Sequence, residues 1–160
     1  MWLKEKQPQE SLLDAWDLVH IDWFIVFEHG DMPWKLAKLL KPGYRHCYAV
    51  RYDGHEWIYF HPHLGHTDIR VVAAPPGSTI FDVVSTGYSA IIHIDTQQKV
   101  GKVRQAWPTF FTCVEQIKAL LGIRAGFVFT PWKLYKLLKG KGYGFYETES
   151  AREVRRTDCG

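Results

Sequence analysis

The chain has 160 residues, of which 46% are hydrophobic and 23% charged, and its formal net charge is +3. This composition indicates a globular protein, and the length allows one domain with a real core but not two ordinary ones. Arg and Lys are concentrated at 133–141 and 152–156, but the mild net charge gives no argument for nucleic-acid binding. No apolar run approaches the about 18 residues of a membrane span, and the N-terminus lacks the apolar core of a secretory signal. We therefore expect synthesis in the cytoplasm, without export and without a membrane span.

The first half of the chain predicts a helix, a strand, a second helix and a β-hairpin. Residues 11–20 have the pattern of a short amphipathic helix, and the aromatic and β-branched run at 22–29 predicts a buried strand. A compact helix is expected at 31–43, where one proline lies near the start and a Pro-Gly pair marks the end. The dipeptide Asp53-Gly54 between two alternating runs then predicts a two-residue hairpin turn.

The second half predicts further strands followed by two helices. Strands are expected at 67–72 and 88–95, and residues 78–87 between them form a strand or a short helix. Two helices are expected at 112–123 and 130–142, because each segment begins with a capping threonine and ends at glycine.

This order of elements predicts a single α+β domain. We place the domain at residues 22–146, between an N-terminal extension, 1–21, that carries the short helix and a polar C-terminal tail, 147–160. The chain has three cysteines and no CxxC pair, which argues against a disulfide framework and favours a reducing compartment.

Cys113 has the position expected of a reactive cysteine, directly after the predicted cap Thr112. Unpaired N–H groups and the positive end of the helix dipole stabilise a thiolate there. The same N–H groups can bind the oxyanion that forms when a thiolate attacks a carbonyl. A buried structural cysteine is the competing interpretation. Cys47 is interpreted as a packing residue, because strand alternation turns it away from the face of its neighbour His46, and Cys159 as an exposed bystander in the tail.

Two histidines lie at the open end of the predicted hairpin. With the turn at Asp53-Gly54, His46 lies directly opposite His61 and shares its face. A register slip of two residues would replace His61 by His63 and keep the same face. One imidazole would then activate a nucleophile while the second orients the first.

The same segment offers a rival arrangement for metal binding. His61, His63 and His66 follow the spacing H-x-H-x-x-H, which can hold zinc. The spacing resembles the metallo-β-lactamase signature, but it lacks the aspartate expected before the last histidine and has no clear downstream ligands. The alternative is that Pro62 and Gly65 make this segment a turn whose histidines are loop residues.

Taken in order, the segments resemble the circularly permuted papain-like thiol hydrolases. This group is related to the NlpC-type cell-wall peptidases and includes the YiiX-like and lecithin–retinol acyltransferase-like proteins; its strands come first and its cysteine helix last. Residues 22–50 resemble the opening strand, short helix and histidine strand of the group, and residues 56–63 resemble the strand with the third site residue. Residues 112–123 resemble the nucleophile helix, and residues 130–138 a trailing helix.

The resemblance implies a permuted papain-like fold, with a small antiparallel sheet or half-barrel packed on the nucleophile helix. It implies a thiol hydrolase in which Cys113 is the nucleophile, His46 the general base and acid, and His61 the orienting residue. The implied substrate is an amide, first of all a peptidoglycan peptide bond, or an ester, cleaved through an acyl-enzyme without metal or cofactor. Many relatives of this type are encoded by tailed bacteriophages, which suggests the bacterial cell wall and virion proteins as partners.

Two other interpretations remain open. The chain could be a non-catalytic virion or assembly protein that keeps the fold and docks through the basic helix 131–141 and its aromatic residues. It could also be a zinc enzyme that uses the histidine cluster.

Overall fold

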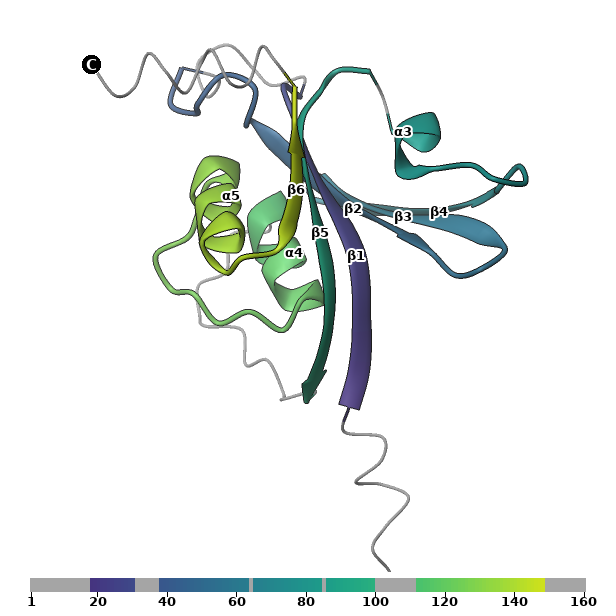
Figure 1. The fold of residues 1–160 in the computed structure, drawn as a ribbon. Coiled ribbons are helices and arrows are strands. Elements are labelled where there is room, and N and C mark those ends of the chain that lie inside the picture. The colour runs from purple at the N-terminus through teal and green to yellow at the C-terminus, as the bar shows by residue number, and fades with distance from the viewer. Residues whose placement is uncertain (1–17, 31–37, 64, 85, 100–111, 149–160) are drawn as a thin grey trace, which may run out of the picture.

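The computed structural model describes residues 18–30, 38–63, 65–84, 86–99 and 112–148. Within them, a six-stranded antiparallel sheet and three helices form an α+β fold, as predicted (Figure 1). None of the helices in these residues combines the length and apolar character needed to cross a membrane. Predictions for residues 1–17, 31–37 and 149–160, including the interpretation of Cys159, lie outside the described residues.

The sheet has the order β4-β3-β2-β1-β5-β6. Its strands are β1 (Leu18–Glu28), β2 (His46–Tyr52), β3 (Glu56–Pro62), β4 (Thr67–Ala73), β5 (Tyr88–Lys99) and β6 (Gly144–Glu147). The long strands β1 and β5 pair from one end to the other and form the longest ladder of the sheet (Figure 1). Ile25, Val26 and Phe27 of β1 are all completely buried, because helices cover both faces of the sheet at this point.

The helices divide between the two faces of the sheet. Helices α4 (Cys113–Leu120) and α5 (Pro131–Gly140) pack on one face, and the short α3 (Ile80–Val83) lies on the other (Figure 1). The two capping predictions are confirmed: the hydroxyl oxygens of Thr112 and Thr130 each accept a backbone N–H three residues later, at 3.3 Å.

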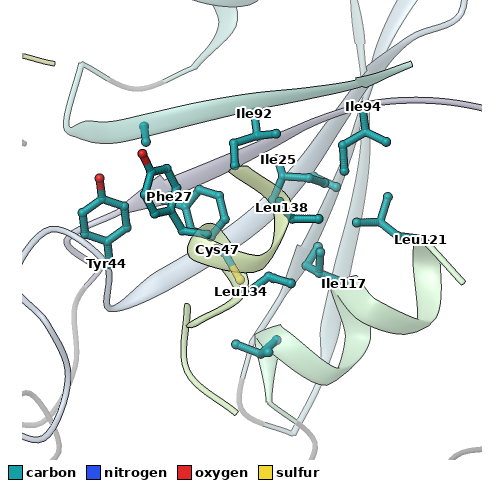
Figure 2. Packing of buried hydrophobic residues seen from close by; sticks show 14 of the residues in the cluster. Ile25, Phe27, Tyr44, Cys47, Ile92, Ile94, Ile117, Leu121, Leu134 and Leu138 are labelled. Carbon is teal, nitrogen blue, oxygen red and sulfur yellow. The ribbon is translucent and has the colours of Figure 1, made fainter. Parts of the chain in front are cut away.

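The larger core cluster lies between the sheet and helices α4 and α5 (Figure 2). The sheet contributes Ile25, Phe27, Cys47, Ala49, Ile92 and Ile94, and the helical side contributes Val114, Ile117, Leu121, Leu134 and Leu138. A second cluster on the α3 side contains Tyr48, Val50 and Trp57. Alternation along β2 therefore sends Cys47 toward the helices and Tyr48 toward α3.

Three elements differ from the sequence prediction. Residues 18–20 belong to β1 rather than to the predicted helix at 11–20, because their backbone pairs with the end of β5, which outweighs a weak helical pattern. Residues 38–43 form turns instead of the second half of the predicted helix at 31–43. Strand β6 was not predicted; it pairs with β5 between Ala90 and His93.

The predicted register of the hairpin is wrong by two residues. The ladder of β2 and β3 runs from Ala49–Phe60 to Tyr52–Trp57. The turn is one residue later than predicted. The Asp53 carboxylate accepts hydrogen bonds from the backbone N–H groups of residues 55 and 56, at 2.9 and 2.8 Å, and so stabilises the turn in this position. The backbone N–H of Asp53 donates to the carbonyl of residue 56, so Asp53 lies before the turn and not within it. The pairing that places His63 opposite His46, weighed above as the alternative, continues this register.

Candidate active site

Cys113 begins α4, and several contacts fix the start of this helix. Thr112 caps the first turn, and the Thr67 hydroxyl donates a hydrogen bond to the side-chain oxygen of Gln116, which ties α4 to the beginning of β4. The amide of the first helical residue has no acceptor within its own helix, so it is available to an anion. The sulfur of Cys113 is partly buried beside the larger core cluster.

The surroundings of Cys113 favour its thiolate. A hydrogen bond from the Cys47 side chain, together with a hydrogen bond from His46 and the charge on that imidazole, lowers the pKa of the Cys113 thiol to about 5, although burial acts in the opposite direction. Of these contributions, the hydrogen bond from Cys47 is the largest. A thiol with this pKa is ionised at neutral pH, which is the state that attacks a carbonyl.

The pKa of the Cys47 thiol is shifted in the opposite direction. Cys47 is completely buried, and this burial, followed by the hydrogen bond and the charge of Cys113, raises the pKa of the Cys47 thiol well above its ordinary value. Cys47 therefore stays protonated and donates its S–H to the Cys113 thiolate. From the sequence, Cys47 is predicted to be a packing residue only. Strand alternation gave its face correctly, but no local signal indicated that the N-terminus of α4 lies on that face.

The imidazole of His46 contacts both Cys113 and His61. Its Nε2 lies 2.8 Å from Nε2 of His61, so Nδ1 is the ring nitrogen that remains for the sulfur. His46 is the first residue of β2, at the end of the strand, where its ring can reach the start of α4 although its neighbour Cys47 faces the helices. The structure thus brings together the three residues predicted from the sequence, although His61 is diagonal to His46 rather than directly opposite it.

The His61 imidazole is neutral at physiological pH. Burial is the first cause, and the charges of His46, His63 and Arg70 add to it, so that the pKa of His61 falls to about 4. A neutral imidazole protonated on Nδ1 can accept the Nε2–H of His46. In this tautomer the hydrogen bond holds the ring of His46 with Nδ1 toward the sulfur.

Glu28 is a further residue of the candidate site, and it was not predicted from the sequence. It is the last residue of β1 and pairs directly with His46, so both side chains lie on the same face. One carboxylate oxygen and one nitrogen of each of His46 and His61 lie within 4.8 Å of one another. The carboxylate of Glu28 therefore lies beside the histidine pair. The position of Glu28 beside His46 follows only from the pairing of β1 with β2, which a single sequence does not indicate.

No family model, curated protein or solved structure matches this chain.

A cavity of about 360 Å³ adjoins the histidine pair on the α3 side of the sheet. It is lined by Glu28, Tyr48, Tyr59, His61, Arg70, Val72 and Val83. The Tyr59 hydroxyl donates to the carbonyl of Val83 at 2.6 Å, which joins β3 to the end of α3 across this cavity. The cavity thus places aromatic walls and one guanidinium next to His61.

The predicted zinc triple His61, His63 and His66 does not form one site. His61 is hydrogen-bonded to His46, whereas the imidazoles of His63 and His66 lie beside Asp68. Among the residues that the structure describes, potential ligands instead form two groups of three, one that contains Glu28 and one that contains Asp68.

The alanine variant of Gly30 tests whether the position of His46 matters for the site. Gly30 has a φ of +60°, and a Cβ there would lie 2.6 Å from Cβ of His46. Gly30→Ala is therefore expected to lower the free energy of unfolding by more than the about 1–2 kcal/mol that the left-handed conformation alone costs, and to slow alkylation of Cys113 at pH 6 because His46 is displaced. Denaturant unfolding and iodoacetamide labelling measure the two effects.

Gly77→Ala is the matched control. Gly77 has a similar φ of +77°, but a Cβ there would meet nothing within 4 Å. This variant should have the backbone cost alone and unchanged labelling of Cys113. Equal labelling rates in the two variants would show that close packing of Gly30 against His46 has no role in the site.

Proposed function

We propose that the protein is a cysteine hydrolase that cleaves an amide or ester bond through Cys113, His46 and His61. The observation that carries the proposal is the relay of contacts at the start of α4: a sulfur whose pKa is lowered to about 5, in contact with an imidazole whose other nitrogen lies 2.8 Å from a second imidazole. A nucleophile, a base and a group that orients the base are the parts that thiol hydrolysis requires.

The proposed reaction begins from the ion pair of the Cys113 thiolate and protonated His46. The thiolate attacks the carbonyl carbon, and the carbonyl electron pair moves to the oxygen, where N–H groups of the first turn of α4 stabilise the negative charge. When the intermediate collapses, the carbon–nitrogen or carbon–oxygen bond breaks, and His46 gives its proton to the leaving group. The acyl group remains on Cys113 as a thioester.

The second half of the reaction releases the acyl group. Neutral His46 takes a proton from water as the water oxygen attacks the thioester, and collapse of the second intermediate yields the acid and restores the ion pair. His61 accepts the Nε2–H of His46 throughout, and the carboxylate of Glu28 stabilises the charge that His46 carries in the resting state.

We further propose that the fold is a permuted papain-like fold. The support is the order along the chain: β1, the strand pair with His46 and His61, and only then the helix that begins with Cys113. By the same resemblance, a peptidoglycan peptide bond is the proposed substrate, and a phage virion the proposed setting. Arg70 in the cavity beside His61 offers a cation to a carboxylate, a group that such peptides carry.

The test of this proposal is capture of the acyl-enzyme. Incubation with an activated ester or with a peptidoglycan muropeptide should add the mass of the acyl group to the protein, and peptide mapping should find it on Cys113. Treatment with EDTA should leave turnover unchanged, because no step uses a metal. Turnover without a thiol adduct, even in rapidly quenched samples, would contradict the proposal.

A second candidate is supported by one specific observation. Glu28, His46 and His61 present ligand atoms within 4.8 Å of one another, a set that suits a catalytic zinc with two histidines and one carboxylate. In that case EDTA would abolish turnover and zinc would restore it, whereas iodoacetamide would leave the metal-dependent reaction intact. The two candidates thus give opposite results with the same two reagents.

A further inference from the structure

The turn that joins β3 to β4 brings two imidazoles to the same side of the chain. The backbone N–H of His63 donates to the carbonyl of His66 at 2.8 Å, and Gly65 adopts a φ of +89° within this turn. The two rings stack, with centroids 4.7 Å apart and planes inclined by 16°. The turn therefore holds the two side chains in parallel.

Asp68, the second residue of β4, faces both of these rings. Its Oδ2 lies 3.6 Å from Nε2 of His63, and its Oδ1 lies 3.9 Å from Nε2 of His66. Both separations exceed the distance of a hydrogen bond. The Asp68 carboxylate is therefore within ion-pair distance of both imidazoles but forms no hydrogen bond to either.

These separations are close to those of ligands around a metal ion. Tetrahedral zinc with bonds of about 2.0–2.2 Å holds its ligand atoms roughly 3.3–3.6 Å apart. One ligand atom from each of His63, His66 and Asp68 lies within 4.8 Å of the others, so small side-chain rotations suffice to enclose an ion.

We propose that His63, His66 and Asp68 form a binding site for a divalent transition-metal ion such as Zn²⁺. Two imidazole nitrogens and one carboxylate oxygen suit this class of ion and not the hard cations Mg²⁺ and Ca²⁺. The His66 side chain is 64% exposed, which gives the ion a path from solvent and leaves a coordination position open. Arg70 donates to Oδ2 of Asp68 at 3.0 Å and orients the carboxylate from outside the site.

This site is separate from the Cys113 site and does not depend on hydrolase activity. His61, whose ring centroid is 4.4 Å from that of His63, is hydrogen-bonded to His46 and is not a ligand. A bound ion joins the β3–β4 turn to β4 next to the histidine pair. Its expected effect on the protein is therefore a higher melting temperature in the presence of Zn²⁺.

Calorimetric titration of metal-stripped protein with ZnCl₂ tests the proposal. A full-length Cys113→Ser, Cys159→Ser background removes two thiols that would themselves bind zinc, and it separates the result from any hydrolase activity. One equivalent of Zn²⁺ should bind, and His66→Ala and Asp68→Asn should each weaken binding by about tenfold or more. MgCl₂ should give no binding.

Two control variants make the result decisive. His20→Ala removes a different exposed imidazole, which lies 2.7 Å from Asp95, and it should leave zinc affinity unchanged. His46→Ala removes a ligand of the other candidate cluster and should also leave it unchanged. Binding that persists in His66→Ala, or binding that is lost in His46→Ala, would overturn the assignment, as would the absence of a one-equivalent site.

Discussion

Replacement of Cys113 by alanine is expected to lower kcat/KM by about four orders of magnitude or more. The sulfur forms the covalent bond to the acyl group, and neither His46 nor His61 can replace it as nucleophile in this geometry. Binding energy and the N–H groups of α4 remain, so a small residual rate over uncatalysed hydrolysis is compatible with the proposal. The measurement is the steady-state rate on the same ester or peptide substrate that acylates the wild-type protein.

The controls for this prediction separate chemistry from folding. Cys113→Ala removes a small, partly buried side chain at a helix start, so its circular dichroism spectrum and unfolding transition should stay close to wild type. His55→Ala, at the exposed tip of the β2–β3 hairpin, should keep full activity. A Cys113→Ala protein that is folded and retains more than about a tenth of the wild-type rate would rule out the thiol mechanism.

The helix that carries Cys113 was predictable because its signals are local. Thr112 and Glu115 mark its first turn in the sequence, and the hydroxyl of Thr112 accepts the Glu115 amide in the structure. The hairpin was likewise predictable from alternation and from a turn dipeptide. Such features depend on neighbours within about four residues, so a single sequence contains them.

The histidine pair was predicted for a partly incorrect reason. The predicted register assumed a turn at Asp53-Gly54, but the Asp53 side chain stabilises a turn that is one residue later. His46 and His61 nevertheless meet, because side chains on a shared face reach diagonal as well as direct partners. Prediction of the shared face was therefore more robust than prediction of the pairing.

Neither the position of Glu28 in the site nor the role of Cys47 could be predicted from the sequence, because both depend on the arrangement of distant elements. Glu28 reaches the site only because β1 lies next to β2, and Cys47 meets Cys113 only because α4 packs on one particular face. The sequence order of strands and helices is compatible with several sheet orders and with either face. Neither contact has a local signature that could select among them.

His46→Ala is expected to have the second-largest effect, and to act on the thiol as well as on the rate. Loss of the imidazole removes a hydrogen bond and a positive charge that lower the pKa of Cys113, so the midpoint of its alkylation profile should move upward from pH about 5. In the wild type, reactivity rises as pH increases through this midpoint and is lost below it, because only the thiolate reacts. Loss of the general base and acid should lower kcat/KM by about 10²–10⁴.

The measurement is the rate of iodoacetamide labelling from pH 4 to 9, with Cys113 and Cys47 resolved by peptide mapping. Cys47 should remain unlabelled in the native wild type, since it is buried and burial raises the pKa of its thiol. Equal labelling of the two cysteines would contradict the site geometry.

Two substitutions of Cys47 distinguish its hydrogen bond from its packing. Cys47→Ala deletes the donor that contributes most to the lowered pKa of Cys113, so this variant should also shift the labelling midpoint upward. Cys47→Ser keeps an O–H donor in nearly the same volume and should shift the midpoint less. Both variants retain His46, so their loss of kcat/KM should be smaller than that of His46→Ala. If the midpoint stays at about 5 in both His46→Ala and Cys47→Ala, then neither neighbour activates the sulfur, and the helix start alone must account for its ionisation.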